Sequence, residues 1–302
     1  MRRIPMNVVI ATLCEAKRTE QLLRAIRSIQ DQEGVDPEII LVVNGTRFDP
    51  ELLETMRARA DLRVVYQEEG NLPKAIWTGR TQVTRDYFAF LDDDDEYIKD
   101  RLRGGLDILE ADPSVDVVVS NGVRIFGGVQ EPIYTSMEAC KADPLKDLFN
   151  QSWLNSSSGI YRTSSVPPDF FSDMQKYFEW TSIAFKMAAQ KKVAFREEYV
   201  NRIHDTPGSL SKTLDFILAV EPFLLKLLEL DLRPELRRAL SIKLSSAYHD
   251  ISDMYLYRGN LVKAWRYHIK SMRGGHGMRY LFYTRKLILF RGLLGIRAAV
   301  SS

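Results

Sequence analysis

The sequence predicts an α/β protein, with a parallel sheet covered by helices and a separate helical region at the carboxy terminus. Short β-branched runs alternate with helical patterns over roughly the first 200 residues, which is typical of strand–helix–strand units. From about residue 214 the strand signals stop, and apolar residues recur at helical spacing. We therefore expect two parts, residues 1–213 and residues 214–302.

The elements of the first part follow in order along the chain. The apolar, β-branched runs Asn7 to Thr12 and Glu38 to Val43 predict the first two strands. Between them, apolar residues recur at helical spacing from Leu22 to Ile29, which predicts a helix with one face on the sheet. A helix from Ile98 to Leu109 ends before a proline. Further strands are expected at residues 62–66, 87–91, 115–119 and 193–196.

The second part is predicted to be helical. Apolar residues from Phe223 to Leu228 follow helical spacing, and Pro234 interrupts the pattern. Residues 258–267 resemble the middle of a tetratricopeptide hairpin, with a turn glycine and the small residue Ala264. Because one such unit cannot stack into a solenoid, we expect a helical hairpin docked on the first part.

The charge of the chain is distributed unevenly. The 42 Lys and Arg residues nearly balance the 40 Asp and Glu residues. The apolar content of 45% is enough for a folded core and excludes a disordered chain. After Asp253 there is no acidic residue, and the first 253 residues carry 32 minus 40, or −8. The ten basic residues that follow are Arg258, Lys263, Arg266, Lys270, Arg273, Arg279, Arg285, Lys286, Arg291 and Arg297.

The amino terminus superficially imitates a signal peptide, with two arginines before an apolar run. This run meets Glu15 and Lys17 instead of a small-residue cleavage site, so a buried strand is the better prediction. No stretch of ~18 uninterrupted apolar residues exists that could span a membrane. Two cysteines are too few for a disulfide framework or a zinc site. We expect a cytoplasmic protein.

The run from Phe90 to Tyr97 places at least four carboxylates directly at the end of an apolar strand. Their repulsion is costly unless a cation relieves it, and oxygen ligands select hard ions, here Mg²⁺ or Mn²⁺. Strand ends are also where α/β proteins bind ligands. The alternative is a solvated acidic turn that caps the following helix. A calcium loop is disfavoured because Tyr97 stands where an EF-hand needs glycine.

The acidic run and four further segments resemble, in order and spacing, the motifs of a family 2 glycosyltransferase over roughly residues 6–212. The resemblance implies the GT-A fold, with a Rossmann-like mixed sheet, inverting sugar transfer, and an Asp-x-Asp motif that holds a metal against a nucleotide-sugar diphosphate. The four segments are Asn7 to Thr12, Gly70 to Gly79, Asn155 to Arg162 and Arg202 to Ser211.

The resemblance also implies roles for individual residues. Asp92, Asp94 and His204 would hold Mn²⁺ or Mg²⁺, although a lone His is more often a core or surface residue. Asn44 stands where the family usually has an aspartate, so UDP is the expected nucleotide while dTDP and GDP stay open. Surface charge is the alternative role for Arg18 and Lys74. The residues assigned to the nucleotide sugar are Thr12, Arg18, Asn44, Asn71, Lys74, Asp92 and Asp93.

Glu179 is the candidate catalytic base, because sugar transfer to a hydroxyl needs a carboxylate that accepts the hydroxyl proton. The family supplies this group from an acidic pair at the start of a helix, and Trp180 stands where the second carboxylate is expected. Asp173 is the alternative base. A carboxylate that only stabilises the helix dipole is the alternative role for Glu179.

Residues 273–300 interleave basic, apolar and aromatic side chains. Such a helix can lie in a membrane interface near anionic head groups, or it can pack on the first part or on a second protomer. No nucleic-acid-binding fold accompanies the charge, so no nucleic-acid partner is expected.

Taken with the resemblance, these features predict a metal-dependent hexosyltransferase. The donor would be a nucleoside-diphosphate sugar, and the acceptor a hydroxyl of a glycan or lipid-linked glycan in bacterial cell-surface polysaccharide synthesis. The enzyme would work at the inner face of the cell membrane. The alternatives are an inactive glycosyltransferase-like binding protein and a nucleotidyltransferase. A dinucleotide oxidoreductase is disfavoured because no Gly-x-Gly-x-x-Gly follows the first strand.

Overall fold

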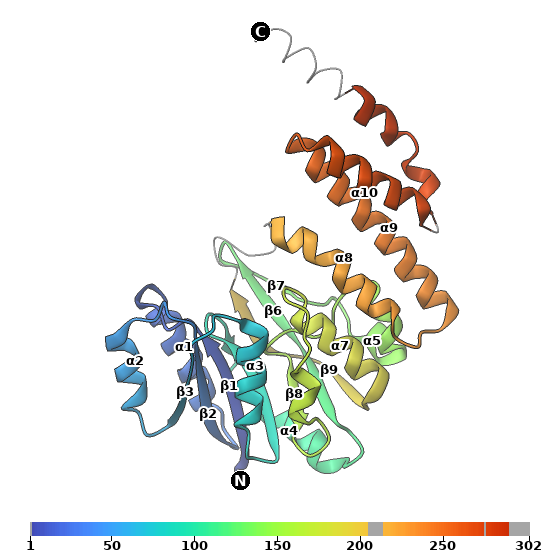
Figure 1. The fold of residues 1–302 in the computed structure, drawn as a ribbon. Coiled ribbons are helices and arrows are strands. Elements are labelled where there is room, and N and C mark those ends of the chain that lie inside the picture. Colours follow the sequence, from blue (N-terminus) through green and yellow to red (C-terminus); the bar gives the residue numbers. More distant parts are fainter. Residues whose placement is uncertain (1, 205–213, 275, 290–302) are drawn as a thin grey trace. The chain divides into compact units, whose positions relative to one another are not determined.

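The computed structural model describes residues 2–204, 214–274 and 276–289 (Figure 1). The chain divides into two compact units, Met1–Pro207 and Gly208–Ser302. The first unit contains the sheet, and the second is helical in its described residues. We describe each unit by itself.

Within the described residues, nine strands of the first unit form one sheet in the order β3-β2-β1-β4-β8-β6-β9-β5, with β7 paired to β6. Strands β1 to β4 pair in parallel, whereas β8 runs antiparallel to both β4 and β6. The sheet is therefore mixed, and not parallel throughout as the alternating pattern alone predicts. The strands are β1 (Ile4–Thr12), β2 (Val35–Asn44), β3 (Leu62–Gln67), β4 (Tyr87–Asp92), β5 (Glu96–Tyr97), β6 (Val117–Phe126), β7 (Val129–Pro132), β8 (Gly159–Arg162) and β9 (Val193–His204).

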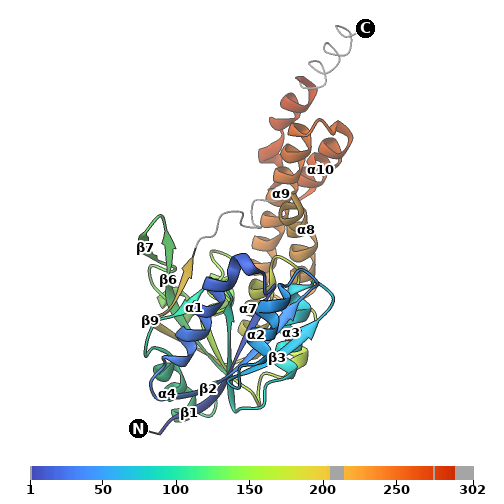
Figure 2. The same ribbon diagram turned by 90° about the vertical axis from the view of Figure 1, so that its left-hand side faces the viewer.

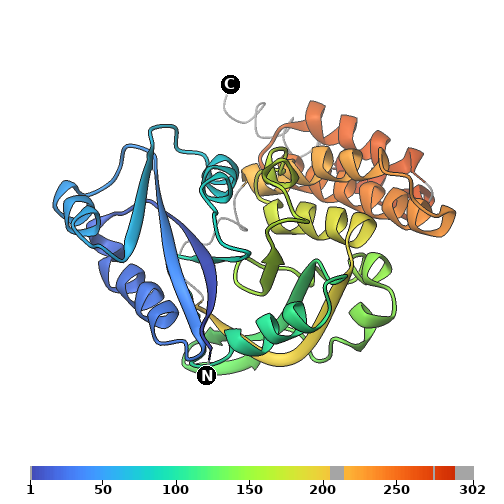
Figure 3. The same cartoon turned by 90° about the horizontal axis from the view of Figure 1, so that it is seen from below.

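Helices cover both faces of the sheet (Figure 3). Alternate residues of β1 and β2 point to opposite faces, and one face packs against buried apolar residues of α1, α2 and α4. On the other face, Gly79 of α3 lies so close to Val9 and Val42 that an added Cβ would overlap Val9. The helices and 3₁₀ turns are η1 (Ala16–Arg18), α1 (Thr19–Gln30), α2 (Pro50–Arg57), α3 (Leu72–Thr81), α4 (Leu102–Ala111), α5 (Glu138–Ala142), α6 (Pro144–Asp147), η2 (Pro168–Phe171) and α7 (Glu179–Gln190).

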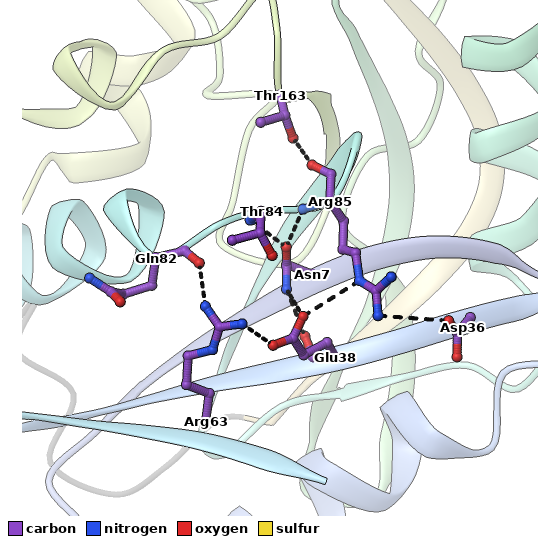
Figure 4. Close-up of polar contacts among 8 residues, drawn as sticks. All are labelled: Asn7, Asp36, Glu38, Arg63, Gln82, Thr84, Arg85 and Thr163. Carbon is purple, nitrogen blue, oxygen red and sulfur yellow. Dashed lines mark hydrogen bonds and ion pairs between the residues drawn. The ribbon is translucent and has the colours of Figure 1, made fainter.

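A polar cluster around the buried side chain of Asn7 ties the α3–β4 connection to the first two strands (Figure 4). The side chain of Asn7 is fully buried, and its Oδ1 accepts hydrogen bonds from the backbone N–H groups of Thr84 (2.9 Å) and Arg85 (2.8 Å). Its Nδ2 donates to Glu38 Oε2 at 3.1 Å. Glu38 also forms ion pairs with Arg63 and Arg85. These bonds fix the loop from which β4 starts.

The second unit is built from α8 (Leu214–Leu228), α9 (Pro234–Tyr257), α10 (Leu261–Arg273), η4 (Gly277–Tyr280) and a helical segment over residues 283–289 (Figures 1 and 2). Helices α9 and α10 form the expected hairpin. Gly259 adopts φ +74° in the turn, and the Asn260 side chain caps α10 by accepting from the backbone N–H of Lys263 at 3.1 Å. Along the described parts of the chain, no helix is long and apolar enough to cross a membrane.

Candidate active site

The acidic run forms a turn between β4 and β5, at the carboxyl end of the central strands. Asp92 is the last residue of β4 and pairs in register with Ala11 of β1, so the ends of the two strands lie side by side. Thr12, the last residue of β1, donates a 2.6 Å hydrogen bond from Oγ1 to Asp93 Oδ2. The backbone N–H of Cys14 in turn donates to Thr12 Oγ1 at 2.9 Å. Thr12 and Asp93, both assigned to the nucleotide sugar by the resemblance, are thus in direct contact.

Two arginines from the segment after β1 reach this turn. The Arg18 guanidinium contacts Asp93 Oδ1, and its Nη2 lies 3.0 Å from Asp94 Oδ2. Arg24, on α1, donates to the backbone carbonyl of Asp94. The Nε atoms of both arginines are buried, and among the described residues they have no hydrogen-bond acceptor. Such buried donors suit a site that takes an anionic ligand.

The carboxylates of the turn crowd one another. The pKa of Asp92 is raised to about 7, mainly by burial and in addition by the charges of Asp94, Asp93 and Glu179. Ser156, from the segment before β8, opposes this rise by donating a 2.7 Å hydrogen bond to Asp92 Oδ2. Burial and the charge of Asp92 also raise the pKa of Asp95, to about 8. Full ionisation of the turn is therefore unfavourable, and a bound cation would favour it.

Glu179 is the first residue of α7, and its charge contributes to the raised pKa of Asp92. The side chain is buried, and Oε1 accepts from the backbone N–H of Tyr177 at 3.0 Å. Tyr177 adopts φ +71°, an unfavourable backbone conformation for a residue with a side chain. Burial raises the pKa of Glu179. Glu179 is thus a buried carboxylate within electrostatic reach of Asp92.

The structure also places Trp180 and Asp173, the two residues that bear on the choice of Glu179 as the base. The Trp180 ring packs edge-on against Phe90 of β4, with ring centroids 5.2 Å apart. It therefore has an apolar packing role where a second carboxylate was expected. Asp173, the alternative base, forms an ion pair with Lys186, and about half of its side chain is exposed.

Asn44, at the end of β2, lies in a separate polar cluster with Gln67 and Asn71. Its Oδ1 accepts from the backbone N–H of Asn71 at 2.8 Å and from Gln67 Nε2 at 3.1 Å. Asn71 caps α3 by accepting from the backbone N–H of Lys74 at 3.2 Å. The Lys74 ammonium lies 2.6 Å from Glu69 Oε2 on the surface. Asn44 thus holds the loop before α3 in place.

His204, the last residue of β9, contacts the end of the acidic run. Its backbone N–H donates to Asp95 Oδ1 at 3.0 Å, and its Nε2 is 3.3 Å from Glu96 Oε1. The structure thus brings His204 to the acidic run through Asp95 and Glu96. The loop from Pro207 to Ser211 that belongs to the same motif lies outside the described residues.

The donor set of the turn suits a hard cation. In the part of the chain that the structure describes, no three His, Cys, Asp or Glu side chains form a ready-made metal site. A Mg²⁺ or Mn²⁺ ion commonly takes only one or two protein carboxylates and completes its shell with water and phosphate oxygens. The crowded carboxylates Asp92 and Asp94 fit this open kind of site.

Comparison with known proteins decides the family. The model of glycosyl transferase family 2 matches residues 7–197. The chain belongs to this family. It is a glycosyltransferase, and the GT-A fold with its mixed sheet and helical carboxy-terminal region is confirmed. A search of curated proteins gave no match.

Several solved structures share the fold of this glycosyltransferase. S. aureus TarS 1-349 in complex with UDP-GlcNAc is 15% identical, with a TM-score of 0.60 over 89% of this chain and 81% of that chain. The complex of the same fragment with UDP is 16% identical, with a TM-score of 0.52 over 87% of this chain and 75% of that chain. A longer TarS structure matches over 81% of this chain but only 43% of its own length.

Sequence reasoning missed three residues of the site, Ser156, Gln67 and Arg24. Ser156 lies within the matching segment Asn155 to Arg162, and its hydroxyl donates a hydrogen bond to Asp92. Gln67 ends β3 and therefore lies at the same sheet edge as Asn44. Its position at a strand end was the signal that could have identified it. Arg24 gave no such signal.

Proposed function

We propose that this glycosyltransferase is a metal-dependent, inverting enzyme that uses a nucleoside-diphosphate sugar, with UDP as the nucleotide. The observation that carries the proposal is the acidic turn after β4, where Arg18 contacts Asp93 and Asp94, and where the charges of these aspartates and of Glu179 act on the buried Asp92. The fold neighbours solved with UDP-GlcNAc and UDP support a uridine donor.

The donor side of the site is assigned to the ends of β1, β2 and β4 and to the loop before α3. Asp94 is the principal metal ligand, with Asp92 and His204 around the same ion. When bound, Mn²⁺ or Mg²⁺ would neutralise charge on the diphosphate leaving group. Arg18 and Arg24 carry buried Nε donors that favour the anionic diphosphate. The residues proposed to contact the nucleotide sugar are Thr12, Arg18, Asn44, Asn71, Lys74, Asp92 and Asp93.

Glu179 is the proposed base. The oxygen of the acceptor hydroxyl attacks the anomeric carbon as the bond from that carbon to the diphosphate oxygen breaks. The bonding electron pair leaves with the nucleoside diphosphate, and Glu179 accepts the hydroxyl proton. Attack from the side opposite the leaving group inverts the anomeric configuration. The raised pKa of Glu179 makes its carboxylate a better proton acceptor than an ordinary glutamate.

The proposed acceptor is a glycan or lipid-linked glycan of the bacterial cell surface, reached at the inner face of the cell membrane. In this proposal residues 1–213 form the catalytic domain, and residues 214–302 form the helical region. Division of the described chain into two compact units supports separate roles for the two parts.

The proposal is tested by measuring the thermal stability of the full chain with a panel of nucleotide sugars, each with and without Mn²⁺. We expect one donor to stabilise the protein only when Mn²⁺ is present, and Asp94→Ala to abolish that response. Asp169→Ala, on η2, is the matched control. Stabilisation by a donor without any sugar transfer would indicate an inactive binding protein. No response to any donor would refute the proposal.

A further inference from the structure

After Asp253, the charged residues of the helical unit are all basic. Between residues 254 and 289 the sequence has eight basic residues and no Asp or Glu. Two of them are neutralised, because Lys270 lies 2.6 Å from Glu221 and Lys286 lies 2.5 Å from Asp253. The other six are exposed: Arg258, Lys263, Arg266, Arg273, Arg279 and Arg285.

The outer face of α10 combines these charges with apolar side chains. Val262, Arg266, Ile269 and Arg273 follow the i, i+4, i+7, i+11 spacing that places residues on one helix face. Val262 is 82% exposed and Ile269 is 41% exposed. The opposite face of the helix is buried within the unit. This face is therefore both basic and apolar.

The segment after α10 continues the same pattern. Leu287 is fully buried against α9 and α10, which holds the segment on the helical unit. The neighbouring large apolar side chains nevertheless face solvent, and Phe282 is 75% exposed. The Arg285 guanidinium lies 5.7 Å from the centre of the Phe282 ring. The exposed apolar residues of the segment are Met278, Leu281, Phe282, Ile288 and Leu289.

We infer that these exposed residues of α10 and of residues 278–289 form a docking surface for an anionic lipid bilayer. Apolar side chains enter the boundary of the acyl chains while the arginines meet anionic head groups. Nucleic acid would use the cations but leave the aliphatic side chains in water. A symmetric dimer would bring two copies of the same surface together, which places basic residues against basic residues.

The inference is independent of catalysis, since it concerns the helical unit alone. Its consequence for the proposed function is that the enzyme would stay near a lipid-linked acceptor. Electrostatic attraction to the bilayer is screened by salt. Binding should therefore weaken as the salt concentration rises, while part of it persists through the apolar side chains.

Vesicle flotation of the full chain tests this surface. We expect the protein to float with vesicles of equal parts phosphatidylcholine and phosphatidylglycerol, and to stay in solution with phosphatidylcholine alone. The double variant Arg266→Glu, Arg273→Glu should bind more than tenfold more weakly, because each basic residue near an anionic surface contributes about fivefold. Phe282→Ser combined with Leu289→Ser should also reduce flotation.

Matched controls lie on the first unit, where Arg57→Glu changes an exposed charge and Phe126→Ser an exposed aromatic ring. Both should float like the wild type. Equal flotation with neutral vesicles, or none with anionic vesicles, would overturn the inference. The inference would also be overturned if the protein formed a dimer and the Phe282→Ser, Leu289→Ser variant were a monomer. Normal UDP binding by the non-floating variants would show that the proposed function stands separately.

Discussion

Arg18 occupies the place where a bound cation would neutralise the acidic turn, and replacing it by methionine has two opposite expected effects. In the structure its guanidinium contacts Asp93 and lies 3.0 Å from Asp94 Oδ2. A metal that binds Asp94 Oδ2 competes with this contact. The displaced guanidinium is then free to bind the diphosphate that arrives with the metal. Arg18→Met should therefore strengthen metal binding and weaken donor binding.

The size of the first effect follows from the geometry. Two unit charges 3.0 Å apart interact with about 5 kcal/mol at an effective dielectric constant of ~20. Desolvation and side-chain ordering oppose most of this attraction. A net coupling of roughly 1–3 kcal/mol corresponds to about 5–150-fold tighter Mn²⁺ binding in the variant. The loss of a charge-assisted hydrogen bond to the diphosphate, about 1.5–3 kcal/mol, weakens donor binding by about tenfold or more.

Calorimetric titration of Mn²⁺, and then of UDP at saturating Mn²⁺, measures both effects on the full chain. Arg18→Lys should behave more like the wild type because it keeps the charge. Arg57→Met removes a remote Arg–Glu contact on α2 and should change neither affinity. If Arg18→Met binds Mn²⁺ no more tightly than the wild type, the guanidinium does not compete with the metal.

Three further predictions concern the fold and the chemistry. Asn7→Ala removes the acceptor of two backbone N–H groups, so urea titration should show a loss of about 1–3 kcal/mol. A loss below about 0.5 kcal/mol would contradict the role of the cluster. Glu179 accepts a proton only as a carboxylate, and burial raises its pKa, so activity should fall as the pH falls through a value above 4.5. Glu179→Gln should lose most of the activity, and the remaining activity should not show this fall. Full activity in Glu179→Gln would contradict the assignment of Glu179 as the base. Ser156→Ala removes a hydrogen bond that lowers the pKa of Asp92, so more of this carboxyl group is protonated at neutral pH. Metal binding should therefore weaken at neutral pH and recover at higher pH. A loss of metal binding that does not depend on pH would argue against this explanation.

Local patterns in the sequence predict much of the first unit, because burial and helix spacing leave periodic signals. The strands from Ile4–Thr12 to Tyr87–Asp92 and the helix before Pro113 are present as expected. β8 has only four residues and enters the sheet antiparallel between β4 and β6, far from them in the chain. A short buried strand has no periodicity that reveals its partner. The mixed pairing was therefore accessible only through the family resemblance.

In the candidate site, too, local features could be predicted from the sequence and contacts between distant residues could not. The acidic run is contiguous, so its position at a strand end is visible in the sequence. The contact between Ser156 and Asp92 joins residues 64 positions apart, and the role of Asn44 depends on Gln67 and Asn71 from neighbouring elements. Such contacts depend on strand order and loop paths, which residue type alone does not determine.

The central claim is that the acidic turn binds a nucleoside diphosphate through a divalent metal. Titration of UDP into the full chain, in Mn²⁺ and again in excess chelator, tests this most directly. We predict that Mn²⁺ tightens UDP binding by about tenfold or more, a difference of ~1.4 kcal/mol, and that Asp94→Asn removes this gain. Equal UDP affinity with and without the metal, or an unchanged gain in Asp94→Asn, would contradict it.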